Sequence, residues 1–433
     1  MKRGFYTIMS AQFFSSLADN ALFVTAVELL RANGAPEWQR AALVPMFALF
    51  YVVLAPFVGA FADALPKGRV MLISNAIKMI GCLMMLFGNH PLLAYAVIGL
   101  GAAAYSPAKY GILTELLPAS QLVKANGWIE GLTITSIILG VLVGGQLVGP
   151  TISHHLLSLD FPYIDTGIDT PAEAAIMVLI AVYAIAAWFN LRIPLTGVPL
   201  RPVRQDPDKS LAANIVGLLP DFWTCSQRLW ADKLGQISLS TTTLFWGASG
   251  NLRYIVLAWG AAALGYSTTQ ASALVGVVAI GTAIGAVVAS MRMRLDTATS
   301  VIPLGIGMGL LVVCMIFIHS LWVAVPFLIL LGGLGGFLVV PMNALLQHRG
   351  HNLMGAGRSI AVQNFNEQAA ILAMGAFYSL STKFGLTAFG AITVFGLVVA
   401  GIMLLIGIWH RRNCREHPME VARLLDIARR DCH

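Results

Sequence analysis

Residues 321–347 read LWVAVPFLILLGGLGGFLVVPMNALLQ and contain no charged side chain. A helix needs about 20 mostly apolar residues to cross a hydrocarbon core of roughly 30 Å, so this stretch is long enough to span a membrane. Similar stretches recur almost from end to end of the 433-residue chain, in which 58% of residues are hydrophobic and 11% are charged. This composition predicts a polytopic α-helical membrane protein and leaves little chain for a soluble domain.

Apolar runs predict about twelve membrane spans. They lie at residues 5–32, 41–64, 69–88, 91–116, 121–149, 173–193, 235–264, 269–291, 299–319, 321–347, 353–382 and 386–409. Lys and Arg in the loops of membrane proteins concentrate on the cytoplasmic side. If both termini are cytoplasmic, only Arg31, Arg40 and Lys383 fall in loops on the other side of the membrane. The net charge of +7 therefore indicates a basic cytoplasmic face and not a nucleic-acid partner.

The predicted fold is an all-α membrane protein of two pseudo-symmetric six-helix bundles. The bundles at residues 1–193 and 235–410 are joined by a cytoplasmic linker at 194–234 that includes an interfacial helix. A basic cytoplasmic tail follows at 411–433. The tail can place apolar residues on one helix face and arginines against anionic lipid, and a solvated charged tail is the alternative.

Three matches at one offset suggest that the two halves arose by a parallel duplication. GLGAAAYSP at residues 99–107 and GLGGFLVVP at 333–341 share the positions of two glycines and a proline. The same offset carries Asp19 onto Arg253, and a lysine at the start of the fifth span onto an arginine at the start of the eleventh. In transporters such repeats place the substrate site between the halves, near the bilayer midplane.

Several polar side chains lie inside the predicted spans. A charge at the bilayer centre costs at least ~2.5 kcal/mol, so it persists where it faces a cavity or a partner, usually for a function. Asn364 and Glu367 share one face of their helix, whereas Lys78 is interpreted as a packing residue outside the site. The candidate substrate-binding residues are Asp19, Asn20, Lys109, Glu130, Arg253, Asn364 and Glu367.

Asp19 and Arg253 are expected to face one central cavity from opposite halves. They would pair while the cavity is empty and separate when a zwitterionic head group arrives; a permanent ion pair that fastens the halves is the alternative. Lys109 lies roughly 13 Å from the cytoplasmic end of its span, at ~1.5 Å per residue. That depth suits a phosphate ligand, and snorkelling of the long side chain to the interface is the alternative.

The sequence GAFADALPKGR at residues 59–69, after the second span, predicts a cytoplasmic gate. Asp63 can cap the N-terminus of a neighbouring helix, or pair with a base, while the inner side is closed, and this contact would break on opening. Arg69 is grouped with Asp63 in the gating role. An ordinary charged turn is the alternative.

His155 and Asp160 have the spacing of glycerolipid acyltransferases, in which an aspartate orients a histidine base. They stand in a short outward-facing loop without a supporting domain, so a chance match is the preferred interpretation. The sequence has no Walker A motif, zinc-ligand spacing or nucleophile elbow. No enzymatic activity, metal site or ATP use is therefore predicted.

The two six-span halves, the basic linker and the turn at residues 59–69 resemble the major facilitator superfamily. The chain departs from the superfamily pattern at Ala64, where many members have arginine. It is more specifically similar to the bacterial lysophospholipid transporter family. The segments that carry this similarity are ADNAL (18–22), APFVGAFAD (55–63), KGRVM (67–71), GAAAYSPAKYGIL (101–113), LVKANG (122–127), FWGA (245–248), VVPMNALLQ (339–347) and AVQNFNE (361–367).

This resemblance implies a flippase that moves lysophospholipids, chiefly lysophosphatidylethanolamine, to the cytoplasmic leaflet of the bacterial inner membrane by alternating access. A separate cytoplasmic acyltransferase and acyl-carrier-protein synthetase would then reacylate them. The implied head-group contacts are Asp19, Lys109 and Arg253, and the residues implied to line the path are Asn20, Glu130, Asn364 and Glu367.

Other functions stay open at this point. A cation-coupled efflux carrier for amphipathic compounds is the main alternative, and a membrane-embedded acyltransferase that uses His155 and Asp160 is a third. No cofactor is expected, and coupling to a sodium ion or a proton, bound at Asp19 or Glu367, is left open. The expected partners are the lysophospholipid, the bilayer and the separate acyltransferase, and the protein is expected to be a monomer.

Overall fold

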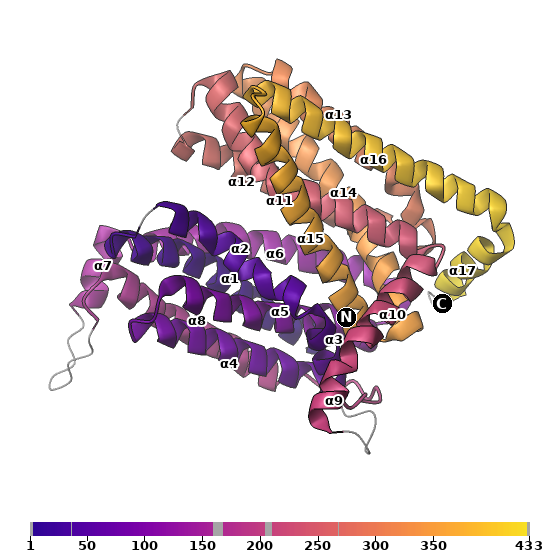
Figure 1. The fold of residues 1–433 in the computed structure, drawn as a ribbon, viewed down its shortest axis with the longest axis horizontal. Helices are drawn as coiled ribbons and strands as arrows, with labels where there is room; N and C mark the ends of the chain where they lie inside the picture. The colour runs from indigo at the N-terminus through magenta and orange to yellow at the C-terminus, as the bar shows by residue number, and fades with distance from the viewer. Residues whose placement is uncertain (1–2, 36, 159–167, 204–209, 267, 431–433) are drawn as a thin grey trace. The chain divides into compact units, whose positions relative to one another are not determined.

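The structure is a computed structural model that describes residues 3–35, 37–158, 168–203, 210–266 and 268–430. These residues are almost wholly helical and contain no strand (Figure 1). The elements are α1 (Arg3–Ala32), α2 (Glu37–Val53), α3 (Ala55–Ala64), α4 (Lys67–Leu86), α5 (Pro91–Leu116), α6 (Ala119–Leu147), α7 (Pro150–Leu157), α8 (Pro171–Leu191), α9 (Leu211–Val216), α10 (Leu218–Ala231), α11 (Gly235–Leu264), α12 (Thr268–Arg292), η1 (Leu295–Val301), α13 (Ile302–Cys314), η2 (Met315–Phe317), α14 (Leu321–Met354), α15 (Ala356–Lys383), α16 (Ala388–Glu416) and α17 (Pro418–Arg430).

Each predicted span coincides with a helix or a run of helices. Within the described ranges, nine helices are long and apolar enough to cross a membrane, and ten if the bent pair α2 and α3 counts as one span. The other two predicted spans, α11 and α15, are helices of 30 and 28 residues whose polar side chains lower their hydropathy. The predicted fold class, an all-α protein that crosses a membrane many times, is confirmed.

The second predicted span is broken into α2 and α3, which bend by 65° relative to each other. Leu54 at the break has φ −100° and ψ 6°. Pro56 follows in the first turn of α3, where it lacks an N–H for the preceding helix and its ring would clash with a carbonyl four residues earlier. The break makes α3 a short separate helix with Asp63 in its last turn.

Local signals set the ends of the long helices. Thr170 and Glu173 form a capping box at the start of α8, in which each side chain accepts a hydrogen bond from the backbone N–H of the other. α11 ends at Gly265, whose φ of +65° is a left-handed conformation that glycine adopts without steric cost.

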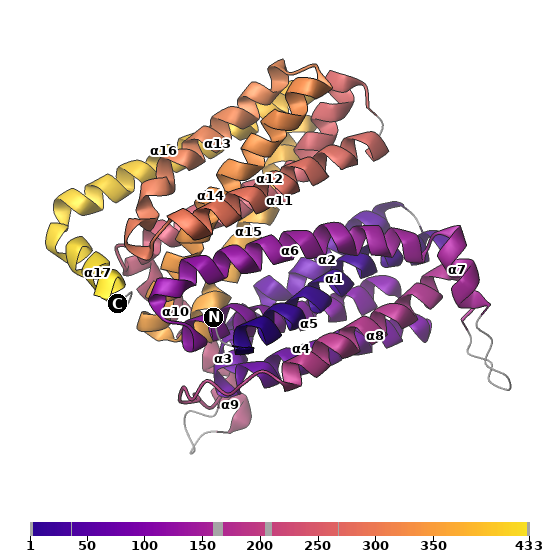
Figure 2. The ribbon, with the colours of Figure 1, turned by 180° about the vertical axis from the view of Figure 1, so that it is seen from behind.

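The chain forms two compact units that exchange short segments of sequence. Unit 1 comprises Met1–Ile112, Thr135–Phe222 and Ala356–Ala361, and unit 2 comprises Leu113–Ile134, Trp223–Gly355 and Val362–His433. In unit 1, α1 and α4 pack against α8 (Figure 1). In unit 2, α12 packs along α14 and α13 packs along α16 (Figure 2). The first half of α6 thus belongs to unit 2, and the start of α15 belongs to unit 1.

α12 and α14 approach each other through four glycines. These are Gly281 and Gly285 on α12, and Gly332 and Gly336 on α14. A Cβ atom at any of the four would overlap a backbone carbonyl oxygen of the other helix. Small residues four positions apart are the usual basis of such close helix packing in membranes.

Replacing Gly285 with alanine is expected to lower the free energy of unfolding by about 1–3 kcal/mol, because the added methyl group has no space beside the Gly333 carbonyl. Thermal unfolding in detergent measures the loss. Gly276→Ala on the same helix is the matched control, since nothing lies within 4 Å of its added Cβ. Equal stability of the two variants would contradict this account of the packing.

The C-terminal helix α17 is tied to unit 2. Its Val421 and Ala428 side chains are buried, and it packs against η1 and α16. Arg429 Nε lies 3.4 Å from the Asp296 carboxylate on η1. Part of the apolar face of the basic tail is therefore covered by protein.

Candidate functional site

Asp19 lies on α1 within a polar cluster of unit 1. Its Oδ2 atom accepts a hydrogen bond from Lys78 Nζ at 2.7 Å, and its Oδ1 atom accepts one from the Tyr183 hydroxyl at 2.6 Å. Lys78 also donates to the Ser15 hydroxyl at 3.0 Å, and this hydroxyl donates to Asn75 at 2.8 Å. Three helices, α1, α4 and α8, thus hold the carboxylate from two sides.

The Lys78 side chain is almost completely buried, with 1% of its surface exposed, whereas Asp19 keeps 19% exposed. The Lys78 ammonium also lies over the rings of Tyr105 and Tyr183, at 5.0 and 5.6 Å from their centroids. A buried charge persists only with a partner, so the ion pair fixes α4 against α1. Lys78, expected to be a packing residue outside the site, is instead the direct partner of Asp19, the central acidic candidate.

The other two candidates of unit 1 are Lys109 and Asn20. Lys109 on α5 is buried, and its ammonium lies 4.1 Å from the centroid of the Tyr110 ring. Asn20 is half-buried and donates to the Ser16 carbonyl of its own helix at 2.8 Å. Lys109 therefore remains a cation inside a span, held beside an aromatic face.

Glu130 and Glu367 belong to one buried amide network in unit 2. Gln363 Nε2 donates to Glu367 Oε1 at 2.7 Å and to Asn343 Oδ1 at 2.9 Å, and Asn343 donates a long 3.5 Å bond to Glu130 Oε1. All four side chains are buried, and so is that of the candidate Asn364 on the same helix as Glu367. The network joins α6, α14 and α15, and its two bridging amides, Gln363 and Asn343, are not among the candidate site residues.

Replacing Gln363 with methionine is expected to cost about 1–3 kcal/mol of unfolding free energy, because Asn343 and Glu367 each lose a buried hydrogen bond. Thermal unfolding in detergent measures this effect. Gln368→Met changes a half-buried amide on the same helix and serves as the control, with an expected change near zero. A larger loss in the control than in Gln363→Met would refute the bridging role.

Two residues singled out in the sequence, Arg253 and Asp160, cannot be placed in full. Arg253 lies in α11, but its side chain is outside the described residues, so its pairing with Asp19 stays a prediction. Asp160 is also outside the described residues, while His155 is exposed on the short helix α7.

Asp63 caps the N-terminus of α15 within unit 1. Its two carboxylate oxygens accept hydrogen bonds from the backbone N–H of Gly357 at 2.8 Å and of Arg358 at 3.1 Å. Lys67 Nζ lies 2.9 Å and Arg358 Nη1 lies 3.3 Å from the same carboxylate. The Arg358 guanidinium also pairs with Asp221 of α10 at 2.8 Å. The capping geometry expected of Asp63 is present, on a helix that lies far away in the sequence.

Arg69 does not take part in this cap. It is exposed, whereas Lys67, two residues earlier, is buried and holds Asp63. Gly357 is required beside the carboxylate, because an added Cβ would lie 2.5 Å from Asp63 Oδ1 and 2.7 Å from the Gly59 carbonyl oxygen. The basic partner of Asp63 on its own turn is thus Lys67 and not Arg69.

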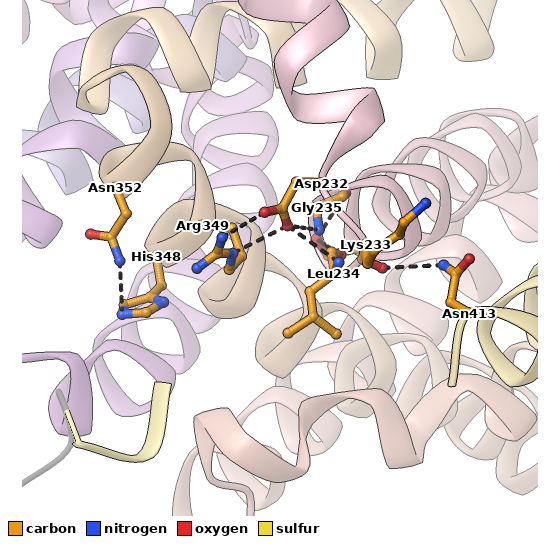
Figure 3. A network of polar contacts seen from close by, with 9 residues as sticks. Asp232, Lys233, Leu234, Gly235, His348, Arg349, Asn352 and Asn413 are labelled. Carbon is orange, nitrogen blue, oxygen red and sulfur yellow. Dashed lines mark hydrogen bonds and ion pairs between the residues drawn. The ribbon is translucent and has the colours of Figure 1, made fainter. Parts of the chain in front are cut away.

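A buried ion pair of unit 2 lies where α11 begins (Figure 3). Arg349 of α14 binds both carboxylate oxygens of Asp232, at 3.2 Å from Nε and 2.5 Å from Nη2. Asp232 Oδ1 also accepts the backbone N–H of Leu234 and of Gly235, at 3.2 and 2.7 Å. This pair ties the turn between α10 and α11 to α14, and no sequence pattern pointed to it.

Comparisons with known proteins place this fold and these residues in context. The family model of the Major Facilitator Superfamily matches residues 8–370. The chain is 39% identical to the lysophospholipid transporter LplT of Enterobacter sp. (strain 638) over 412 residues, which cover 95% of this chain and 97% of that one. It is 40% identical to LplT of Yersinia enterocolitica over 386 residues, which cover 89% of each chain.

Solved structures agree on the fold. The Major Facilitator Superfamily transporter FucP in its outward conformation superposes with a TM-score of 0.67 at 14% identity, covering 94% of this chain and 98% of FucP. The human organic anion transporter MFSD10 gives a TM-score of 0.67 at 15% identity, covering 95% of this chain and 100% of that one. At such low identity these similarities establish the architecture alone.

Proposed function

Because the chain belongs to the lysophospholipid transporter family of the Major Facilitator Superfamily, we propose that it moves lysophospholipids across a membrane by alternating access. The observation that carries this proposal is the 39% identity to a lysophospholipid transporter over 95% of the chain. Charged residues inside the spans support it, because a polar head group needs charged partners where the bilayer provides none.

The head group of lysophosphatidylethanolamine carries a phosphate and an ammonium, and unit 1 offers a partner for each. Lys109 is the proposed phosphate ligand, since an ammonium is a good point-charge partner for phosphate. Asp19 is the proposed partner of the substrate ammonium, because its carboxylate keeps 19% of the side chain exposed. Lys78 and Tyr183 act as positioning residues that orient this carboxylate.

Two further roles are proposed for polar residues of the chain. Arg253, Asn20, Glu130, Asn364 and Glu367 line the path of the head group. Asp63 acts as a gate, because opening at the N-terminus of α15 would break its bonds to the Gly357 and Arg358 amides.

We propose the bacterial inner membrane as the location, with both termini in the cytoplasm, since Lys and Arg concentrate in the loops on that side. There the transported lipid would meet a separate acyltransferase that restores its second chain. A monomer suffices for this function. Removal of the lysophospholipid by reacylation could draw transport downhill, and a coupling sodium ion or proton would bind at Asp19 or Glu367.

Uptake of labelled lysophosphatidylethanolamine by reconstituted vesicles tests the proposal. Lys109→Ala is expected to lower the initial rate by about tenfold or more, because a charge-assisted hydrogen bond contributes about 1.5–3 kcal/mol. Lys109→Arg should restore part of the rate, since it keeps the charge. Lys124→Ala removes an exposed lysine at the start of α6 and serves as the control. Unchanged uptake in Lys109→Ala would overturn the assigned role.

A further inference from the structure

A lateral pocket of about 580 Å³ lies in unit 2 between α11, α15 and α16. Its walls are almost entirely apolar and include Met374, Ile402 and Leu405. Ile402 is 39% exposed and Leu405 is 63% exposed, so the pocket opens on the surface of the unit. The volume lies within the range of about 300–1,000 Å³ that small-molecule sites occupy.

Two tryptophans close one end of this pocket. The rings of Trp230 and Trp409 stack, with centroids 6.4 Å apart and an angle of 10° between their planes. Tryptophan is enriched where a membrane meets water. The seven steps from Ile402 to Trp409 span about 10 Å of helix at ~1.5 Å per residue. This length fits within one leaflet, about half of a hydrocarbon core of roughly 30 Å.

Basic residues lie just beyond the tryptophan pair. Asn413 Nδ2 donates to the Lys233 carbonyl at 3.3 Å, which brings Lys233 next to α16, one helical turn past Trp409 (Figure 3). Arg412 follows Trp409 by three residues and therefore lies on the same side of α16. Lys233 and Arg412 thus lie on adjacent elements near this end of the pocket.

Both cations are available to a ligand. The Lys233 ammonium points away from the Asp232–Arg349 pair in Figure 3, and Asp232 is already neutralised by Arg349. Arg412 pairs with Glu416 at 2.8 Å, but both side chains are more than half exposed. Such exposed pairs are weak, so a phosphate can compete for Arg412.

We propose that this pocket binds one acyl chain of an anionic diacyl phospholipid, with its phosphate held by Lys233 and Arg412. The chain lies along the apolar wall, and the tryptophan pair marks the level at which the acyl chain ends and the head group begins. A zwitterionic lipid such as phosphatidylcholine also carries a phosphate, but its choline cation would be repelled by the two bases, so the site favours a lipid with a net negative charge. None of the residues assigned to the lysophospholipid lines the pocket, so this site is separate from the transport path.

Quenching of tryptophan fluorescence by lipids with brominated acyl chains tests this assignment, because bromine quenches on contact. The signal of Trp230 and Trp409 is the difference between the wild type and Trp230→Phe/Trp409→Phe in phosphatidylcholine nanodiscs. Brominated phosphatidylglycerol is expected to half-quench this signal at about tenfold lower mole fraction than brominated phosphatidylcholine, as expected for two cations at a membrane surface.

Lys233→Ala/Arg412→Ala should remove this preference. Arg411→Ala/Arg423→Ala, which loses the same charge from exposed residues of α16 and α17 that do not line the pocket, should keep it. Equal quenching by the two lipids in the wild type would mean ordinary lipid contact and would overturn the proposal. So would a preference that survives Lys233→Ala/Arg412→Ala, or one that Arg411→Ala/Arg423→Ala removes.

Discussion

Replacing Asp19 with alanine is expected to lower the free energy of unfolding by about 3–5 kcal/mol, the usual loss when one partner of a buried ion pair is removed. The substitution would leave the Lys78 ammonium, 1% exposed, without its carboxylate at 2.7 Å. The Ser15 hydroxyl and two tyrosine rings would remain around it, but none of them carries a negative charge. Thermal unfolding of the purified protein in detergent measures the loss.

Two further variants test whether the unpaired charge of Lys78 causes the loss of stability in Asp19→Ala. Asp19→Leu/Lys78→Met replaces the pair by apolar side chains, and its stability is expected to return close to that of the wild type. Asn20→Ala removes a single hydrogen bond within α1 and should cost about 1 kcal/mol or less. A double variant as unstable as Asp19→Ala would show that the lost charge balance is not the cause.

The second large effect is expected at Asp63. Asp63→Asn should destabilise the protein by about 3 kcal/mol, at the lower end for a buried ion pair, because Lys67 keeps its bond to the Ala62 carbonyl and Arg358 keeps Asp221. An asparagine can accept from only one of the two amides at the start of α15. Its NH2 group would face the other amide, which is also a donor.

Hydrogen exchange of the Gly357 and Arg358 amides measures this effect directly. Both amides should exchange faster in Asp63→Asn than in the wild type, since each donates a hydrogen bond to the Asp63 carboxylate. Arg69→Ala is the matched control on the same turn, and its exposed side chain should leave both rates unchanged. If the amides exchanged faster in Arg69→Ala and not in Asp63→Asn, Arg69 and not Asp63 would be the gating residue.

The helices could be predicted from the sequence because hydropathy depends only on local composition. All twelve predicted spans correspond to helices or runs of helices, including the two whose polar residues make them less apolar. The 65° break between α2 and α3 was missed, since Pro56 in an apolar run predicts a kink or a new helix equally well. Local signals therefore locate the spans but not every bend within them.

Partners across helices were harder to predict. Lys78 lies 59 residues from Asp19, and nothing in the local sequence tells which of several buried polar groups will meet. A charged side chain within a span usually has a partner, and this rule applies to Lys78 as much as to Asp19. Setting Lys78 aside as a packing residue thus removed the partner of Asp19 from the prediction.

In the turn at residues 59–69, too, the sequence did not identify the partner of a charged residue. The pattern predicted that Asp63 caps a helix, but the path of the chain between α3 and α4 decides which base it meets. Lys67, the first residue of α4, lies 2.9 Å from the Asp63 carboxylate, whereas Arg69 is exposed. The identity of the capped helix, α15, depends on packing that no local pattern contains.

The central claim is that charged groups inside the spans carry a lysophospholipid head group across the membrane. Inward movement of labelled lysophosphatidylethanolamine in vesicles, compared for the wild type and Asp19→Leu/Lys78→Met, tests it most directly, because this variant is expected to fold without the charges. The account predicts movement above that of protein-free vesicles for the wild type and no such excess for the folded double variant. Equal movement by both proteins, or a wild-type rate no higher than that of protein-free vesicles, would contradict it.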